Sequence, residues 1–261
     1  ILQGEGWEKG WSLLLEMMGN AAAVTDRSFG VPDGVNNGQY GIGIVIDFFG
    51  LAGKYSGFPV DFVYPSMTAV VPANIGLLAG GKNAEEAKKF MRFTMSKEGQ
   101  QLLFDPKISR LPILPYSQLK APANYPDPQE VAQRAKVQFD SDLAEARYQV
   151  VTGLFDQMVT FRLKELQGST KAIQAAEAAL KAKPNPRGRE LVQQARSLTY
   201  SPLVSAQNVK DEQFLELFRK SRRDVEVSKQ LSGIEQLWAD KARQNYARAT
   251  QLATEARSLA K

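Results

Sequence analysis

The order of segments between Gly38 and Ile113 constrains the fold of this chain more than any other feature. A glycine-rich start leads into an almost unbroken apolar run over 40–49, and β-rich runs follow around a Pro-Ser turn. The first run is typical of a strand buried on both faces. A charged segment over 84–95 then predicts a helix, because Asn83 can cap it and acidic residues occupy its first turn. This alternation predicts an α/β fold, with a mixed sheet covered by helices.

The residues around this core predict further elements. Apolar residues recur at helical spacing over 7–18 and stop at a Gly-Asn pair, which predicts a helix with a clear end. A second helix is expected from Ser28, which can cap it, with Pro32 in its first turn. The runs over 61–64 and 69–71 are the other expected strands.

The C-terminal half has a helical pattern. Five prolines cluster between 112 and 128, too many for a helix or a central strand. One long helical pattern follows over 129–180, and after a KPNPRG turn further helices should form an antiparallel layer. The sequence thus predicts an α/β lobe over 1–115, a proline-rich crossing over 116–128 and an all-helical region over 129–261.

Missing residue types exclude several kinds of function. The 261 residues contain no cysteine and no histidine, which excludes disulfides, Cys-ligated zinc, Fe–S clusters and thiol nucleophiles, and removes the commonest general base. No set of acid, base and nucleophile is visible, so we expect no enzyme, no catalytic residue, no metal and no cofactor. No apolar run reaches the ~18 residues that cross a bilayer, so the chain should not be embedded in a membrane.

Charge divides the chain unevenly. Residues 1–128 carry a net charge of −1 and residues 129–261 carry +6, which together give the +5 of the whole chain. In the basic half, positive and negative side chains alternate, as is usual for a solvated helix face, and aromatic residues are not interleaved with the cations. We therefore expect no nucleic-acid partner.

Asp47 is the first candidate for binding a ligand. It ends an otherwise apolar expected strand, and ligands of open α/β sheets bind outside such strand ends. A carboxylate there needs a donor, which could be an internal group or a ligand hydroxyl. The alternative is that Asp47 caps a helix over 48–55. The neighbouring Phe48 is included among the expected ligand contacts.

Other polar residues are weaker candidates. Ser28 could offer an anion its hydroxyl and the free N–H groups of a helix start, although plain capping is an equal alternative. Tyr64, Ser66 and Thr68 lie in the YPSMT turn, where the alternative is ordinary turn chemistry around the proline. Arg110 could bind an anion bidentately, but a structural ion pair is the expected role.

The segments GQYGIGIVIDFF, VDFVYPSMTAVVPANIGLL, NAEEAKKFMRFTMSKEGQQLL and ISRLPI occur in an order that resembles a known family. It is the second lobe of bacterial ABC-transporter solute-binding proteins, in the branch that binds ferric ion, sugar phosphates and phosphoglycerate. The resemblance covers roughly residues 6–116. It implies a type 2 periplasmic-binding fold and export to the periplasm, and most of a first lobe would precede Gly6.

The resemblance also implies roles for the candidate residues. Iron-binding relatives carry two tyrosines where this chain has Phe48 and Phe49, and phenylalanine has no oxygen to ligate a metal. In the organic-phosphate branch, the acidic residue before this pair, here Asp47, accepts hydrogen bonds from ligand hydroxyls. The family position that matches Ser28 contacts an anion, and the turn that holds Tyr64 closes on the ligand.

Three functions follow as expectations. The first is a periplasmic component of an ABC uptake system, which closes around a small anionic, phosphorylated organic ligand and presents it to an ABC permease. The alternative is a ligand-sensing module that docks on a membrane sensor through its helical region. A ferric-ion binder is the second alternative.

Overall fold

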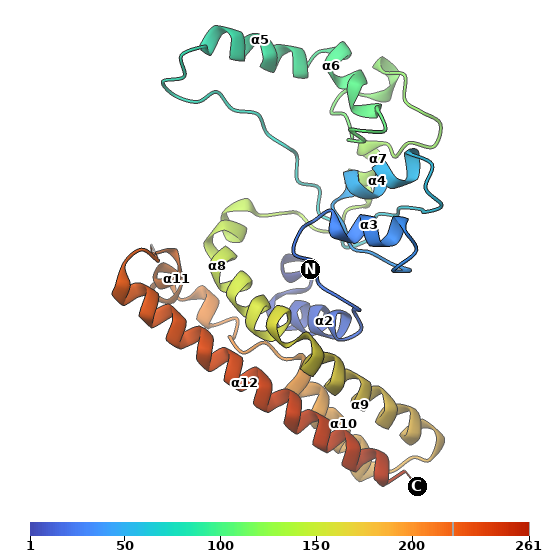
Figure 1. The fold of residues 1–261 in the computed structure, drawn as a ribbon, viewed down its shortest axis with the longest axis vertical. Helices are drawn as coiled ribbons and strands as arrows, with labels where there is room; N and C mark the ends of the chain where they lie inside the picture. The colour runs from blue at the N-terminus through green and yellow to red at the C-terminus, as the bar shows by residue number, and fades with distance from the viewer. Residues whose placement is uncertain (221, 261) are drawn as a thin grey trace. The chain divides into compact units, whose positions relative to one another are not determined.

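The computed structural model describes residues 1–220 and 222–260, which form two compact units (Figure 1). The helical unit consists of Ile1–Val24 and Asp140–Lys261, and the middle unit is Thr25–Phe139. The elements of the helical unit are α1 (Leu2–Glu5), α2 (Trp7–Gly19), α8 (Ser141–Met158), η3 (Thr160–Arg162), α9 (Leu163–Ala182), α10 (Pro186–Tyr200), η4 (Asn208–Lys210), α11 (Glu212–Arg219) and α12 (Val225–Ser258). Those of the middle unit are α3 (Gly30–Asn36), α4 (Asp47–Tyr55), α5 (Ala84–Thr94), α6 (Lys97–Gln101), η1 (Leu102–Phe104), η2 (Tyr116–Gln118) and α7 (Pro128–Arg134).

The expected mixed sheet is wrong. The chain is 63% helical, and within residues 1–220 and 222–260 the only β pairing is an isolated parallel bridge between Ala69 and Val137. Residues 40–46 have no regular secondary structure, and α4 begins at Asp47, so the residue expected at a strand end lies in the first turn of a helix. The α/β lobe predicted from the alternation of β-rich and helical segments is therefore not what forms.

The apolar pattern failed as a strand signal because a strand needs a partner. Ile42, Ile44 and Ile46 are 90%, 66% and 54% exposed, so the side chains expected to be buried on both faces of a sheet face solvent. Alternation and β-branching make a segment suitable for pairing, but the ladder hydrogen bonds come from a second strand that is distant in sequence. The runs over 61–64 and 69–71 are irregular for the same reason.

Local helix signals were more reliable. The helices expected over 7–18 and 84–95 are confirmed as α2 and α5. The helix expected from Ser28 begins instead at Gly30, with Phe29 at its N-cap and no side-chain capping bond, so Ser28 is not its cap. A helix is specified by contacts within four residues, which explains why these segments were visible in the sequence.

The long helical pattern over 129–180 is interrupted. It divides into α7, α8, η3 and α9, and the break between α8 and α9 lies at Val159, which has non-helical backbone angles and is fully buried. The side chain of Asp140 accepts the backbone N–H of Leu143 and so caps α8.

Helix α12 packs along α8, α9 and α10 (Figure 1). Its buried face consists largely of small residues, which lets neighbouring helices approach closely. The buried residues are Leu231, Trp238, Ala239, Ala242, Tyr246, Ala249, Leu252, Ala253 and Ala256. Tyr246 donates its hydroxyl hydrogen to the Met158 carbonyl at 2.7 Å, and Asn185 donates to the Leu259 carbonyl at 3.3 Å. α10 therefore runs antiparallel to both α9 and α12, in line with the expected antiparallel layer, whereas α9 and α12 run parallel to each other.

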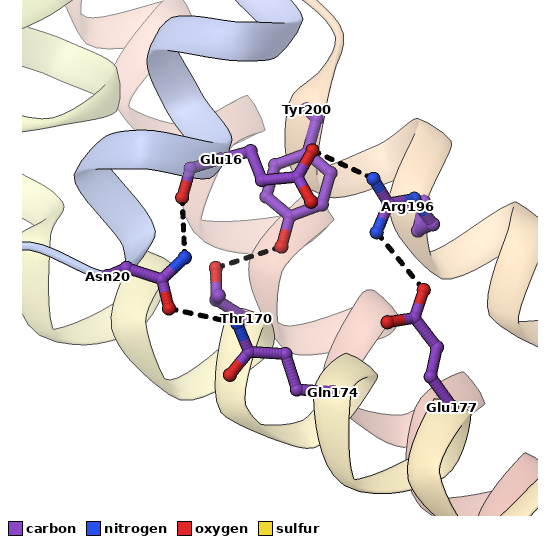
Figure 2. Close-up of polar contacts among 7 residues, drawn as sticks. All are labelled: Glu16, Asn20, Thr170, Gln174, Glu177, Arg196 and Tyr200. Atoms are coloured by element: carbon purple, nitrogen blue, oxygen red, sulfur yellow. Dashed lines mark hydrogen bonds and ion pairs between the residues drawn. The ribbon is translucent and has the colours of Figure 1, made fainter.

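A polar network joins α2 to α9 and α10 (Figure 2). Arg196 of α10 forms ion pairs with Glu16 of α2 at 2.8 Å and with Glu177 of α9 at 3.0 Å. The Gln174 side chain donates to the Asn20 side chain at 2.8 Å. These contacts make α2 part of the helical unit, although more than 100 residues separate it from α9 in the sequence.

Close backbone approach accompanies this network. A Cβ atom added to Gly19, the last residue of α2, would lie 2.1 Å from Thr170 Oγ1. Thr170 is fully buried and accepts the hydroxyl hydrogen of Tyr200 at 3.1 Å. Only a residue without a side chain can occupy position 19 while this hydrogen bond stays in place.

The middle unit has a small core of its own. Leu51, Phe104, Leu119 and Tyr125 are buried, and the rings of Phe104 and Tyr125 meet edge to face with centroids 5.0 Å apart. The buried Gln100 accepts the backbone N–H of Ile113 and donates to the Thr94 carbonyl, both at 2.7 Å. The proline-containing segment after residue 110 is therefore held by packing and by side-chain hydrogen bonds in place of a sheet.

Candidate functional site

The structure brings together three of the residues that the sequence singled out. Asp47 lies in the first turn of α4 and is partly buried. Its Oδ1 atom accepts the backbone N–H of Phe48 at 2.8 Å, and its Oδ2 atom accepts the hydroxyl hydrogen of Tyr64 at 3.1 Å. The carboxylate is also favoured by the positive end of the helix dipole. Internal donors therefore satisfy Asp47 in part, and each of its oxygens can accept a further hydrogen bond.

The position of Tyr64 depends on Gly50, which has no side chain. A Cβ atom on Gly50, in α4, would lie 2.0 Å from Phe62 Cδ2. Because this space is open, the Phe62 ring packs against the helix, and the Tyr64 ring meets it edge to face with centroids 4.9 Å apart. This packing directs the Tyr64 hydroxyl to Asp47. Burial raises the pKa of Tyr64 far above its ordinary value, and the Asp47 charge adds to the effect, so the hydroxyl stays a hydrogen-bond donor.

The ring of Phe48 stacks against the guanidinium group of Arg110. The guanidinium carbon of Arg110 lies 3.6 Å from the centre of the Phe48 ring, which is close contact for a cation–π pair. Arg110 is exposed, and among the described residues its side chain forms no ion pair. The structural ion pair expected for Arg110 is thus absent from the described part of the chain.

Tyr125 is a residue that the sequence analysis missed. It is 6% exposed, and its hydroxyl donates weakly to the Arg110 carbonyl at 3.4 Å. Burial raises its pKa to about 12, opposed by a hydrogen bond with Ser109 and assisted by the charges of Tyr55 and Asp47. Because Tyr125 lies among prolines, no periodic pattern marked it as a core residue. We refer to Asp47, Phe48, Tyr64, Arg110 and Tyr125 together as the Asp47 cluster.

The other candidates lie apart from this hydrogen-bond network. Ser28 is exposed in the turn before α3. The Ser66 carbonyl accepts the backbone N–H of Lys136 at 3.4 Å, and the backbone N–H of Thr68 donates to the Pro65 carbonyl at 3.0 Å. Within the described ranges no hydrogen bond links Ser28, Ser66 or Thr68 to Asp47. Their roles toward a ligand stay predictions.

The Asp47 cluster combines an oriented carboxylate, a phenol held in its neutral form, and an exposed guanidinium on an aromatic ring. A carboxylate accepts hydrogen bonds from hydroxyl groups, and a guanidinium donates paired hydrogen bonds to a phosphate or carboxylate. These groups suit binding of a small ligand that carries both a hydroxyl and an anionic group.

Comparisons with known proteins give a family and two relatives. Residues 1–135 match a family model described as bacterial extracellular solute-binding protein. The chain is also similar to the phosphoglycerate transport regulatory protein PgtC of Salmonella typhimurium and to that of Salmonella typhi. Each match is 32% identical over 222 residues, which cover 84% of this chain and 52% of the relative. The chain therefore spans about half the length of these curated relatives.

Two further comparisons complete this account. No solved structure matches the chain significantly. Among the described residues, no helix combines the length and the apolar character that crossing a bilayer would require. The matched residues 1–135 include α2 of the helical unit and nearly all of the middle unit, together with every residue of the Asp47 cluster. The chain belongs to the bacterial extracellular solute-binding protein family.

Proposed function

We propose that this chain is part of a solute-binding regulatory protein that senses a small phosphorylated organic acid. The proposal combines membership of the extracellular solute-binding family with similarity to two proteins named for the regulation of phosphoglycerate transport. No bond is made or broken in this role. The protein would act by binding its solute and then changing its interaction with a membrane partner.

One observation favours regulation over uptake. The similarity to the regulatory relatives is longer than the stretch matched by the family model, so it extends into the helical region. A helical region shared with regulatory proteins supports the sensing alternative better than a plain uptake component. We propose that residues 1–115 carry the solute site, that 116–128 form a crossing, and that 129–261 dock on a membrane sensor or transporter protein. The periplasm is the proposed location.

The Asp47 cluster supports the proposed ligand class. A phosphorylated hydroxy acid offers a hydroxyl that can donate to Asp47 and an anionic group that can accept from Arg110. Phe48 would hold the guanidinium in place, since a stacked arginine loses less freedom when it binds. Ser28, Tyr64, Ser66 and Thr68 stay proposed contacts of the same ligand. The ferric-ion alternative is less suited to this cluster, because phenylalanine at 48 and 49 supplies no oxygen ligand.

The test is titration calorimetry on protein expressed from the complete gene, with phosphoglycerate, glycerate and inorganic phosphate as ligands. We expect phosphoglycerate to bind tightest, because glycerate lacks the phosphate group and inorganic phosphate lacks the carbon chain with its alcohol hydroxyl. Arg110→Gln should weaken phosphoglycerate binding by about 1.5–3 kcal/mol, the value of a hydrogen bond to a charged group. Arg92→Gln is the matched control, since Arg92 is also exposed and lies on α5.

Two results would contradict the proposal. One is equal affinity for glycerate and phosphoglycerate, which would remove the phosphate from the recognised group. The other is saturable binding of ferric ion with the absorption of an iron–phenolate complex.

A further inference from the structure

A surface groove lies between α9 and α10 in the helical unit. Its volume is about 450 Å³. Leu180 and Val192, which are 6% and 7% exposed, and Pro184 supply its apolar surface. Its polar lining includes Lys181, Arg189, Arg196, Glu177 and Gln193. We name this feature the basic groove.

The charges of the basic groove are not balanced by its own residues. Arg196 forms ion pairs with both Glu16 and Glu177, so its own positive charge is compensated and its side chain is held by two partners (Figure 2). Lys181 and Arg189 are exposed, and neither has an ion pair within the described ranges. The net charge of +6 on residues 129–261 has the same sign. The groove therefore joins an apolar surface to two uncompensated cations on different helices.

The apolar surface and the two cations of the basic groove are complementary to one kind of partner segment. An amphipathic helix that places one or two aliphatic side chains on Leu180 and Val192 would direct acidic residues of its flanks toward Lys181 and Arg189. A small-molecule site would need buried polar groups that converge on the ligand, whereas both free cations here are on long exposed side chains. A nucleic-acid groove would present aromatic rings between its cations, and none of the described residues that line this groove is aromatic.

We propose that the basic groove is a docking site for an acidic amphipathic segment of a partner protein. The proposal rests on the proposed regulatory function only for the identity of that partner, a membrane sensor or transporter protein. The recognition itself depends on the groove. Charge complementarity would set the rate and orientation of docking, and the apolar surface would supply the contact area.

The experiment is a selection of random peptides displayed on phage against the purified chain, followed by fluorescence anisotropy of the enriched peptides. We expect enriched peptides to carry several acidic residues around one or two aliphatic ones. The double charge reversal Lys181→Glu with Arg189→Glu should weaken their binding about tenfold or more. Lys229→Glu with Lys241→Glu makes the same change of net charge on α12, at exposed residues outside the groove, and should change binding less than twofold, on the order of normal surface effects.

Thermal unfolding of both double variants must match the parent chain, so that loss of binding is not loss of fold. The proposal is overturned if no acidic peptide is enriched, or if the charge reversals at 181 and 189 leave binding unchanged. It is also overturned if the chain sediments with phosphatidylglycerol vesicles through these two residues while acidic peptides do not compete, which would identify a lipid surface as the occupant. Because this assay contains no solute, its outcome is independent of phosphoglycerate binding, and either proposal can fail alone.

Discussion

Tyr64 donates its hydroxyl hydrogen to Asp47 Oδ2 at 3.1 Å and thereby links the first turn of α4 to the irregular segment that follows it. Seventeen positions separate the two residues in the sequence. The contact orients the carboxylate of the Asp47 cluster and uses one of its acceptor positions. A ligand hydroxyl can therefore donate to a remaining acceptor position of Asp47. The effect of a substitution here on ligand binding can be measured separately from its effect on folding.

Replacing Asp47 by alanine tests the ligand role of the carboxylate. If Asp47 accepts ligand hydroxyls, Asp47→Ala should weaken phosphoglycerate binding by about 1.5–3 kcal/mol, the range for hydrogen bonds to charged groups. Ser28→Ala should cost less, about 0.5–1.5 kcal/mol, because only a neutral hydroxyl is removed. Calorimetry on protein expressed from the complete gene measures both. A sharp drop in melting temperature without ligand, together with unchanged ligand affinity, would make Asp47 a structural residue only.

Replacing Tyr64 by phenylalanine separates orientation from binding. Tyr64→Phe removes the donor to Asp47 but keeps the ring that packs against Phe62. We expect the free energy of unfolding to fall by about 0.5–1.5 kcal/mol, the net value of one hydrogen bond. Urea unfolding of the ligand-free chain measures it.

Phe62→Leu should lower the melting temperature as well, by removing the ring that fills the space beside Gly50. A Phe62 variant as stable as the parent would contradict this account of how Tyr64 is positioned.

Substitution of Gly19 tests the contact between α2 and α9. A Cβ atom there would lie 2.1 Å from Thr170 Oγ1, so Gly19→Ala should destabilise the chain by about 1–3 kcal/mol through overpacking. This result is opposite to the gain normally seen when alanine replaces glycine in a helix. Circular dichroism during thermal unfolding measures the change.

Thr170 supplies the control for this clash. Thr170→Ala removes the hydroxyl, so Gly19→Ala should cost less in that background than in the parent, whereas Thr170→Ser keeps the hydroxyl and should give little relief. The two sites are in contact, so non-additive energies are expected. Strictly additive effects of Gly19→Ala and Thr170→Ala would show that the close approach does not exist.

Alkaline pH should destabilise the middle unit through Tyr125. Burial raises its pKa from 10.0 to about 12, so the folded chain holds this proton more tightly than the unfolded chain does. The stabilising contribution is complete below pH 10.0 and is lost as the pH rises toward about 12. Urea unfolding across this pH range should give a falling free energy of unfolding, with a shallower fall for Tyr125→Phe. An identical slope for the variant and the parent would show that Tyr125 ionises normally.

The candidate site shows how sequence and structure divide the information. Asp47 was selected because it follows an apolar run, and the run proved not to be a strand, yet the residue lies in a cluster with Phe48 and Tyr64. The alternative of a role at a helix start was nearer to the local structure, since α4 begins at Asp47. Arg110 was expected to form an ion pair and instead stacks on Phe48. Tyr125 was not selected, because its burial depends on a neighbour, Phe104, that lies outside any local pattern.

The sequence by itself determined the helices α2 and α5, the helical nature of the C-terminal half and the relationship to solute-binding proteins. These features depend on periodicity over a few residues or on the order of motifs, and both can be recognised in the sequence without knowledge of tertiary contacts. The tertiary structure alone decided that residues 40–49 would not pair as a strand, that α2 joins α9 and α10 through Arg196, and that Asp47 meets Tyr64. Each of these depends on a partner far away in sequence, and local patterns carry no information about which distant segment supplies it.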